Sequence, residues 1–367
     1  MSSLGVHRHK QKISLFILPK QTGNKSSMEE MLRRYGPLAP KRYKYSELKQ
    51  MTSSFEDKPG GGYGTVFRGS LQDGCEVAVK LLKVSKGNGE ELLNELISIC
   101  RTSHINTVGL LSFCLEGAKR ALVYEYMANG SLEKYIYTEN SDLVIGWDKL
   151  QQIALGIARG LEYLHQGCST RIIHFDIKPQ NIHLDQDFCP KIADFGLAKL
   201  CHLMAGSILS VTEERGTIGF IAPEIFSRGF GVVSTKSDVY SYGMMLLEMV
   251  GGSINKEKGI TNSSSDVYFP NRIYDSIAEQ VQSWEVTCDL EEAMRKMALV
   301  SLWCIQTNPE NRPSMSEVID VLEKSINELE MPPKQFLSCP SIPSYLLSRT
   351  SYAYRSSYCS ASPSLLS

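Results

Sequence analysis

The chain has 367 residues, of which 42% are hydrophobic and 22% charged, a composition that fits a folded globular protein and is too apolar for a disordered one. Its 39 basic and 40 acidic residues give a formal net charge of -1, which offers no argument for nucleic acid as a partner. The longest apolar runs are much shorter than the roughly 20 residues that cross a bilayer, so we expect no membrane span.

Charge is distributed unevenly along the chain. Residues 1–44 contain ten basic and two acidic residues, and residues 331–367 contain three basic residues, eleven serines and no acid. The remaining 26 basic and 38 acidic residues fall in 45–330. Both flanks have the composition of mobile segments. We therefore expect a packed domain at 45–330 between a basic flexible leader, 1–44, and a Ser-rich flexible tail, 331–367.

The domain begins with a glycine-rich segment followed by a predicted hairpin. The glycines are Gly60, Gly61, Gly62 and Gly64. Without a Cβ, their backbone N–H groups can approach phosphate oxygens, although a plain flexible turn has the same composition. Residues 63–68 and 76–80 are rich in β-branched and aromatic side chains and flank a turn at Asp73-Gly74, so they predict two paired strands.

The second of these strands ends in Lys80, and a helix is predicted over residues 90–100. Apolar residues recur along that helix at spacings of three and four, and Glu95 lies on their face. Lys80 taken alone would also fit a solvent-facing strand residue. Because each charge would be costly to bury without a partner, we predict that Lys80 and Glu95 form an ion pair.

The rest of the domain is predicted to be mainly helical. Residues 121–126 predict one more strand, which ends before Asn129-Gly130. Helical apolar periodicity then marks 147–164, 239–250, 294–303 and 315–322. This order predicts an α+β fold with a small β-rich lobe at about 45–127 and a larger, mainly helical lobe at about 128–330.

Three short motifs carry chemistry. They are His174-Phe175-Asp176-Ile177-Lys178-Pro179-Gln180-Asn181, then Asp194-Phe195-Gly196, then Ala222-Pro223-Glu224. Phosphoryl transfer requires a carboxylate near the attacking hydroxyl, oxygen ligands for Mg²⁺ and a cation on the nonreacting phosphates. These parts are supplied by Asp176, Asn181, Asp194 and Lys80. An ordered set of motifs argues against chance occurrence.

With these motifs in this order, residues 55–330 resemble the eukaryotic protein kinases. The runs at 174–181, 236–244 and 308–315, together with 35–52, resemble plant receptor-like kinases of the leaf-rust-resistance-like group. This resemblance implies a bilobal protein kinase fold and a serine/threonine-protein kinase of plant receptor-like signalling, which uses ATP with Mg²⁺ or Mn²⁺ to phosphorylate protein substrates. Because the resemblance covers the kinase domain alone, we expect neither an ectodomain nor a membrane span in this chain.

The resemblance also implies roles in the transfer step. Asp176 is the expected catalytic base, and Asn181 and Asp194 are the expected metal ligands. Lys80 binds the α- and β-phosphates and pairs with Glu95. Lys178 neutralises the γ-phosphate, and a Lys at this place favours Ser or Thr over Tyr as the acceptor.

The same resemblance predicts the surroundings of the nucleotide. Tyr124 guards the back of the adenine pocket, and the hinge runs from Glu125 to Met127. In the helical lobe, Glu224 and Arg312 are expected to form a structural ion pair. The full set of residues expected around the nucleotide is Gly60, Gly61, Gly62, Gly64, Val66, Ala78, Lys80, Glu95, Glu125, Met127 and His183.

Three residues depart from the family pattern. Either Pro59 stands where the first glycine of the loop is expected, or the loop is one residue short, and proline has neither an N–H nor the freedom of glycine. Phe175 replaces the Arg that in many kinases pairs with an activation-loop phosphate. His183 replaces an apolar residue beneath adenine, and because its buried N–H needs a partner we expect weaker ATP binding.

We expect an active enzyme because every acid and base of the transfer step is present. The alternative is a noncatalytic pseudokinase scaffold in which Pro59 and His183 impair ATP binding. A thermal response to ATP distinguishes these two function classes.

Residues 1–44 resemble a juxtamembrane segment, in which each Lys or Arg contributes about 1 kcal/mol of attraction to an anionic membrane surface. A solvated basic tail is the alternative. We expect a cytoplasmic chain, peripheral at the plasma membrane or bound to a membrane receptor complex through this leader.

Overall fold

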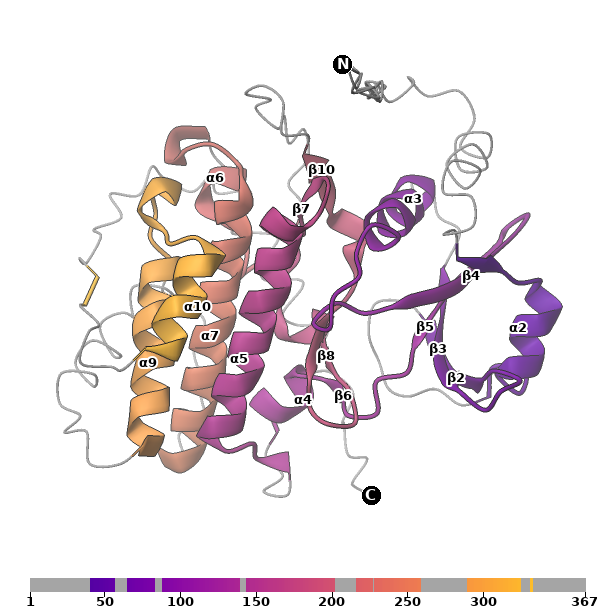
Figure 1. Cartoon of the computed structure of the whole chain (residues 1–367), viewed down its shortest axis with the longest axis horizontal. Helices are drawn as coiled ribbons and strands as arrows, with labels where there is room; N and C mark the ends of the chain where they lie inside the picture. The colour runs from indigo at the N-terminus through magenta and orange to yellow at the C-terminus, as the bar shows by residue number, and fades with distance from the viewer. Residues whose placement is uncertain are drawn as a thin grey trace, which may run out of the picture.

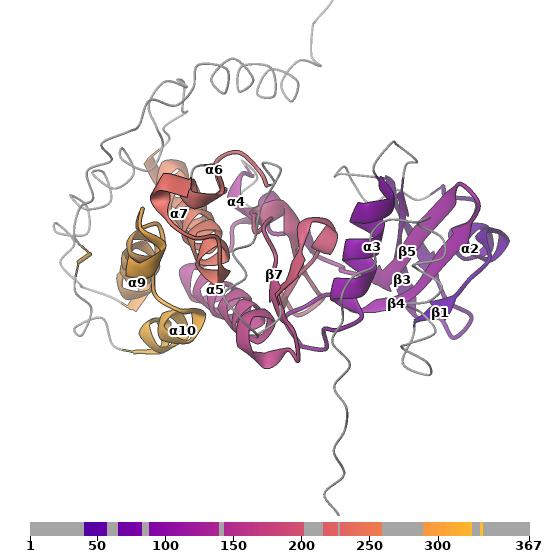
Figure 2. The same ribbon diagram turned by 90° about the horizontal axis from the view of Figure 1, so that it is seen from above.

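The computed structural model describes residues 40–56, 65–82, 88–138, 143–201, 216–226, 228–258, 289–324 and 331–332. These residues form a β-rich lobe followed by a larger helical lobe, which confirms the predicted fold class (Figure 1). Seen from above, the two lobes lie side by side along the long axis of the molecule (Figure 2). Among the described helices, none is long and apolar enough to cross a membrane.

The small lobe is built on a five-stranded sheet. Its strands are β1 (Lys41–Arg42), β2 (Thr65–Ser70), β3 (Glu76–Leu82), β4 (Leu110–Glu116) and β5 (Lys119–Glu125). Their order in the sheet is β1-β4-β5-β3-β2, and only the β1–β4 pair is parallel among these strands. The predicted hairpin is confirmed as β2–β3, with Gly74 at φ 85° in the turn, a conformation that glycine adopts without strain. The sheet also takes in Lys41 and Arg42, which the charge pattern had grouped with the leader.

The two faces of this sheet have different partners. Val77 and Val79 of β3 pack with Leu48 of α2 (Tyr45–Met51), a helix that the sequence did not predict. Ala78 and Lys80 alternate with these residues, so they lie on the opposite face. That face is covered by α3 (Asn88–Ile99), which lies between the sheet and the helical lobe in both views (Figures 1 and 2).

The helical lobe contains each predicted helix. Its helices are α4 (Glu133–Ile136), α5 (Trp147–Glu162), α6 (Pro223–Phe226), α7 (Thr235–Lys258), α9 (Asp289–Cys304) and α10 (Met315–Glu323). The lobe also contains short strands. The strand β6 (Gly130–Ser131) comes just before α4, and four more follow between α5 and α6, namely β7 (Arg171–Ile173), β8 (Ile182–Leu184), β9 (Pro190–Ile192) and β10 (Lys199–Cys201). Three of them form the sheet β6-β8-β9, and β10 pairs with β7.

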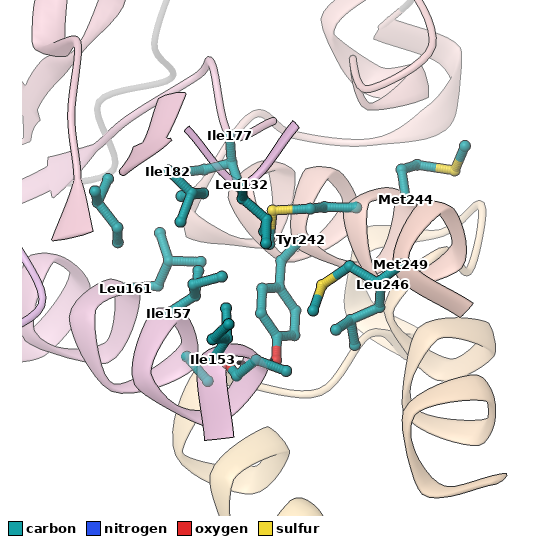
Figure 3. Close-up of a cluster of buried hydrophobic side chains, with 14 of the residues drawn as sticks. Leu132, Ile153, Ile157, Leu161, Ile177, Ile182, Tyr242, Met244, Leu246 and Met249 are labelled. Carbon is teal, nitrogen blue, oxygen red and sulfur yellow. Dashed lines mark hydrogen bonds between the residues drawn. The ribbon is translucent and has the colours of Figure 1, made fainter. Parts of the chain in front are cut away.

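The core of this lobe lies between α5 and α7. Figure 3 shows the ring of Tyr242 between Ile153 and Ile157 on one side and Leu246 and Met249 on the other. Its hydroxyl donates to the carbonyl oxygen of Ala154 at 3.0 Å, so the one polar atom of the side chain is satisfied. This packing fixes α7 against α5 and thereby the loops that both helices carry.

A buried ion pair ties the start of α6 to the segment before α10. The guanidinium of Arg312 donates through both terminal nitrogens to the two carboxylate oxygens of Glu224, each at 2.8 Å, and both side chains are fully buried. Backbone oxygens of Gln306, Thr307 and Lys236 accept its other hydrogens. The predicted pair is therefore confirmed, with a fully satisfied cation.

We predict that Arg312→Leu destabilises the fold by about 3–5 kcal/mol, because it leaves the carboxylate of Glu224 buried without a partner. Chemical denaturation measures the change in the free energy of unfolding. Arg159→Leu is the matched control, since it breaks the half-exposed pair with Glu323 and should cost less than about 1 kcal/mol. Equal losses in the two variants would contradict this assignment.

Candidate active site

A lysine ammonium bridges two carboxylates where the lobes meet. Nζ of Lys80, on β3, lies 3.1 and 3.2 Å from the two carboxylate oxygens of Glu95 on α3. The same Nζ donates to Oδ1 of Asp194 at 3.1 Å. The ion pair predicted from the sequence is therefore present, and Asp194 is a third member that the sequence did not predict as a partner. One cation thus joins the sheet, α3 and the segment after β9.

The charges in this cluster stabilise one another. Burial alone would lower the pKa of Lys80, but the carboxylates of Glu95 and Asp194 outweigh it and raise that pKa above its ordinary value. Burial likewise opposes ionisation of Asp194, yet the neighbouring ammonium lowers its pKa. Burial raises the pKa of Glu95, against the charge of Lys80 and a hydrogen bond donated by the hydroxyl of Tyr124. The ammonium and the Asp194 carboxylate are accordingly both charged at neutral pH.

Asp194 is held in an unusual backbone conformation. Its φ of 63° and ψ of 69° lie in the left-handed region, which costs a non-glycine residue energy. The next residue, Phe195, is fully buried, and its ring lies 4.9 Å from the ring of His174. The bond to Lys80 and the burial of Phe195 hold the strained residue in place, and this aims the carboxylate at the cluster.

The catalytic-loop motif gathers around Asp176. Its Oδ2 accepts from the side-chain amide of Asn181 at 2.8 Å and lies 2.9 Å from Nζ of Lys178. Its Oδ1 accepts from the hydroxyl of Thr217 at 2.7 Å, and that same hydroxyl accepts from Lys178 at 2.6 Å. The structure therefore brings Asp176, Lys178 and Asn181 together as predicted, and adds Thr217. Sequence reasoning missed Thr217 because no spacing rule links it to Asp176, 41 positions earlier.

The backbone of this loop is anchored to α7. The fully buried carboxylate of Asp238 accepts from the backbone N–H groups of His174 and Phe175, both at 2.8 Å. Nε2 of His165 donates to the same carboxylate at 2.9 Å. Phe175 is buried and has a φ of 65°, so its side chain fills the interior. At this position the chain presents an apolar ring where the family pattern has a cation.

Only some of the residues expected around the nucleotide lie among the described residues. Val66 of β2 lies opposite Lys80 in the register, and Ala78 lies two residues before Lys80, so all three share one face of the sheet. Met127 is buried after the end of β5. The side chain of Glu125 accepts from the backbone N–H of Gly109 at 2.7 Å. Pro59, Gly60, Gly61, Gly62 and Gly64 lie outside the described residues.

His183 lies on β8, opposite Ser131 of β6. Burial lowers its pKa to about 4, and the charge of Asp194 opposes this shift while those of Lys80 and Lys134 add to it. The imidazole is therefore neutral at neutral pH, and it offers one N–H donor and one nitrogen acceptor.

The donor set fits a hard cation. The amide nitrogen of Asn181 donates to the backbone and side-chain oxygens of Asp176, which leaves the amide oxygen as a ligand. Asp194 uses Oδ1 for Lys80, and its second oxygen is the other candidate ligand. Mg²⁺ takes oxygen ligands and commonly binds through one or two protein groups together with substrate phosphates. Within the described residues, no group of three or more His, Cys, Asp or Glu is placed to hold a metal.

Comparison with known proteins shows which proteins this chain is similar to. The family described as "Protein kinase domain" matches residues 59–321. The chain is 51% identical over 318 residues to Rust resistance kinase Lr10 of Triticum aestivum, which covers 85% of this chain and 50% of that protein. It is 52% identical over 307 residues to the PR5-like receptor kinase of Arabidopsis thaliana, covering 82% of this chain and 46% of the relative. The chain spans about half the length of the curated relatives it matches.

We predict that the buried imidazole of His174 makes stability depend on pH. Its Nε2 donates to the carbonyl of Ala193 and its Nδ1 accepts from the N–H of Asp176, so the neutral ring is fully used. Burial lowers its pKa below the ordinary 6.5. The unfolded chain therefore binds more protons as the pH falls below about 6.5, and the free energy of unfolding decreases toward acid pH.

Denaturation of the chain and of His174→Gln at pH 7 and pH 5 measures this contribution. In the variant, the free energy of unfolding should depend less on pH, by up to about 1.4 kcal/mol per pH unit. The reason is that its unfolded chain lacks the imidazole that would bind one proton. An identical pH dependence in both proteins would show that His174 does not titrate in this way.

Proposed function

The chain belongs to the protein kinase family, and from that premise we propose that it transfers the γ-phosphoryl group of ATP to Ser or Thr hydroxyl groups of protein substrates. The observation that carries this proposal is the bridging of Glu95 and Asp194 by Lys80, beside a second cluster centred on Asp176. A pseudokinase scaffold would not require both clusters to keep their full set of charges and hydrogen bonds.

In the proposed reaction, the carboxylate of Asp176 accepts the proton of the substrate hydroxyl while its oxygen bonds to the γ-phosphorus. The bond from that phosphorus to the bridging oxygen breaks, and the electron pair leaves with ADP. Asn181 and Thr217 fix the orientation of the carboxylate through their hydrogen bonds. The ammonium of Lys178, 2.9 Å from Asp176, neutralises charge on the transferred group.

The remaining charged residues hold the nucleotide. In this proposal Lys80 binds the nonreacting phosphates, and the position of its ammonium between the sheet and the helical lobe supports that role. Asn181 and Asp194 would hold Mg²⁺, or Mn²⁺ in its place, and the ion would neutralise phosphate charge. Glu95 keeps the ammonium of Lys80 in position, with the hydroxyl of Tyr124 donating to its carboxylate.

The names of the relatives support a setting in plant receptor-like signalling, with protein substrates and a receptor complex as partners. We propose a cytoplasmic location, where ATP is available to the site. The basic residues of 1–44 are the part that we propose for contact with such a complex or with an anionic membrane surface.

A radiolabel transfer assay with the purified chain and a generic protein acceptor tests the proposed reaction. Asp176→Asn should reduce incorporation at least about 100-fold, because it removes the proton acceptor. Asp187→Asn is the matched control, since its side chain is exposed in the turn before β9, and it should retain activity. Incorporation by the chain no greater than that of Asp176→Asn would favour the noncatalytic scaffold instead.

We also predict that His183→Leu binds Mg-ATP about fivefold more tightly, because the variant replaces a polar ring by the apolar side chain that the family resemblance expects beneath adenine. Isothermal titration calorimetry at pH 7.5 measures the dissociation constants of the two proteins. Since the pKa of His183 is about 4, their ratio should be the same at pH 6.5 and pH 8. Equal or weaker binding by the variant would mean that the imidazole finds a hydrogen-bond partner on the nucleotide.

A further inference from the structure

The ammonium of Lys191 connects the helical lobe to the end of β5. Lys191 lies on β9, and its Nζ donates to the carbonyl oxygen of Ile105, in the loop between α3 and β4, at 3.1 Å. The same Nζ lies 3.6 Å from Oε1 of Glu125, the last residue of β5. The side chain of Lys191 is only 12% exposed, so salt and water screen this pair less than one on an open surface. The reaction proposed above does not use Lys191.

The carboxylate of Glu125 has a second partner in the small lobe. Its Oε1 accepts from the backbone N–H of Gly109, directly before β4, at 2.7 Å. In return, the backbone N–H of Glu125 donates to the carbonyl oxygen of Gly109 at 3.2 Å. Lys191 therefore binds an oxygen that already fixes two neighbouring strands to each other. Because Glu125 is the first residue of the expected hinge, this contact acts on the segment about which the lobes move.

The loop that carries Ile105 is fixed to β9 through its backbone. The N–H of Val108 donates to the carbonyl oxygen of Ile192, and the N–H of Ile192 donates to that of Asn106, each at 2.9 Å. These bonds keep the loop with the helical lobe when the two lobes move relative to each other. The ion pair then joins this unit to the end of β5, which belongs to the sheet of the small lobe.

Close packing does not hold this contact in place. A cavity of about 490 Å³ is lined by Glu125 and Lys191, with Gly109, Leu110 and Ile105 among the other residues of its wall. Side chains that border a cavity lack partner atoms on that side, so dispersion forces restrain them less than in a closed core. The charges and hydrogen bonds therefore supply the restraint, and removal of one charge should release it.

We propose that Lys191 is a positioning residue that, through Glu125, restrains the opening of the two lobes and thereby slows release of the nucleotide. Without the ammonium, the end of β5 can move away from β9 with the rest of the sheet. The nucleotide part of this proposal rests on the proposed function, which places ATP between the lobes, whereas the restraint itself does not. Asp176 and its partners lie elsewhere in the helical lobe and keep their contacts.

Hydrogen exchange of backbone amides in the full chain tests the restraint without ATP. In Lys191→Met, the amides of Gly109 and Glu125 should exchange about fivefold faster, because the contact that protects them opens more often. Glu125→Gln removes the other charge and should speed exchange at Gly109 in the same way, whereas Lys191→Arg keeps the charge and should restore the slow rates. Lys149→Met is the matched control, since its ammonium also donates to a backbone carbonyl, that of Asp187 at 3.0 Å, but within the helical lobe.

Stopped-flow release of a fluorescent ADP analogue in the presence of Mg²⁺ tests the nucleotide part. Lys191→Met should release the analogue about fivefold faster than the unmodified chain, and Lys149→Met at the unmodified rate. The double variant Lys191→Met with Glu125→Gln should release it no faster than the faster single variant, because both changes remove the same contact.

Unchanged exchange at Gly109 and Glu125 in Lys191→Met, or equal acceleration in Lys149→Met, would overturn the proposal. Faster exchange with an unchanged rate of release would overturn its nucleotide part. Faster exchange in a chain that binds no nucleotide at all would support the restraint and count against the kinase proposal, so the two failures are distinguishable.

Discussion

The ammonium of Lys80 lies between two carboxylates, and the arrangement of the site depends on this contact. A buried cation is costly without partners, so Glu95 and Asp194 must both stay within hydrogen-bond distance. This requirement sets the position of α3 against the sheet and stabilises the left-handed backbone at Asp194. Because these residues come from the sheet, a helix and the larger lobe, one ion cluster couples the positions of all three.

A large part of the fold and of the candidate site could be predicted from periodic patterns and motifs in the sequence. The alternation of β3 and the spacing of α3 placed Lys80 and Glu95 on surfaces that face each other, and the motif order located Asp176 with its neighbours. The long helices of the larger lobe followed from apolar periodicity, since their buried faces repeat over several turns. The Glu224–Arg312 pair was predicted from the family resemblance alone. Both charges are tolerated in the core because they are paired with each other.

The features that could not be predicted from the sequence depend on contacts between segments that are distant along the chain. The hydroxyl of Thr217 joins Asp176 and Lys178 only because the fold returns the chain to the catalytic loop. The helix α2 has a single fully buried residue, Leu48, so its periodic signal is too weak to predict from sequence. β1 is two residues long and forms only because β4 offers it a free edge. In each case tertiary packing, not local preference, decides the outcome.

The most direct test of this account is a thermal-shift titration with Mg-ATP. A ligand that binds only the folded state raises its stability, by about 2.7 kcal/mol at one hundred times the dissociation constant. The account predicts a saturable rise in melting temperature that is abolished in Lys80→Ala, because the variant lacks the cation that the two carboxylates position for phosphate. No shift up to millimolar ATP, or an equal shift in the variant, would contradict it.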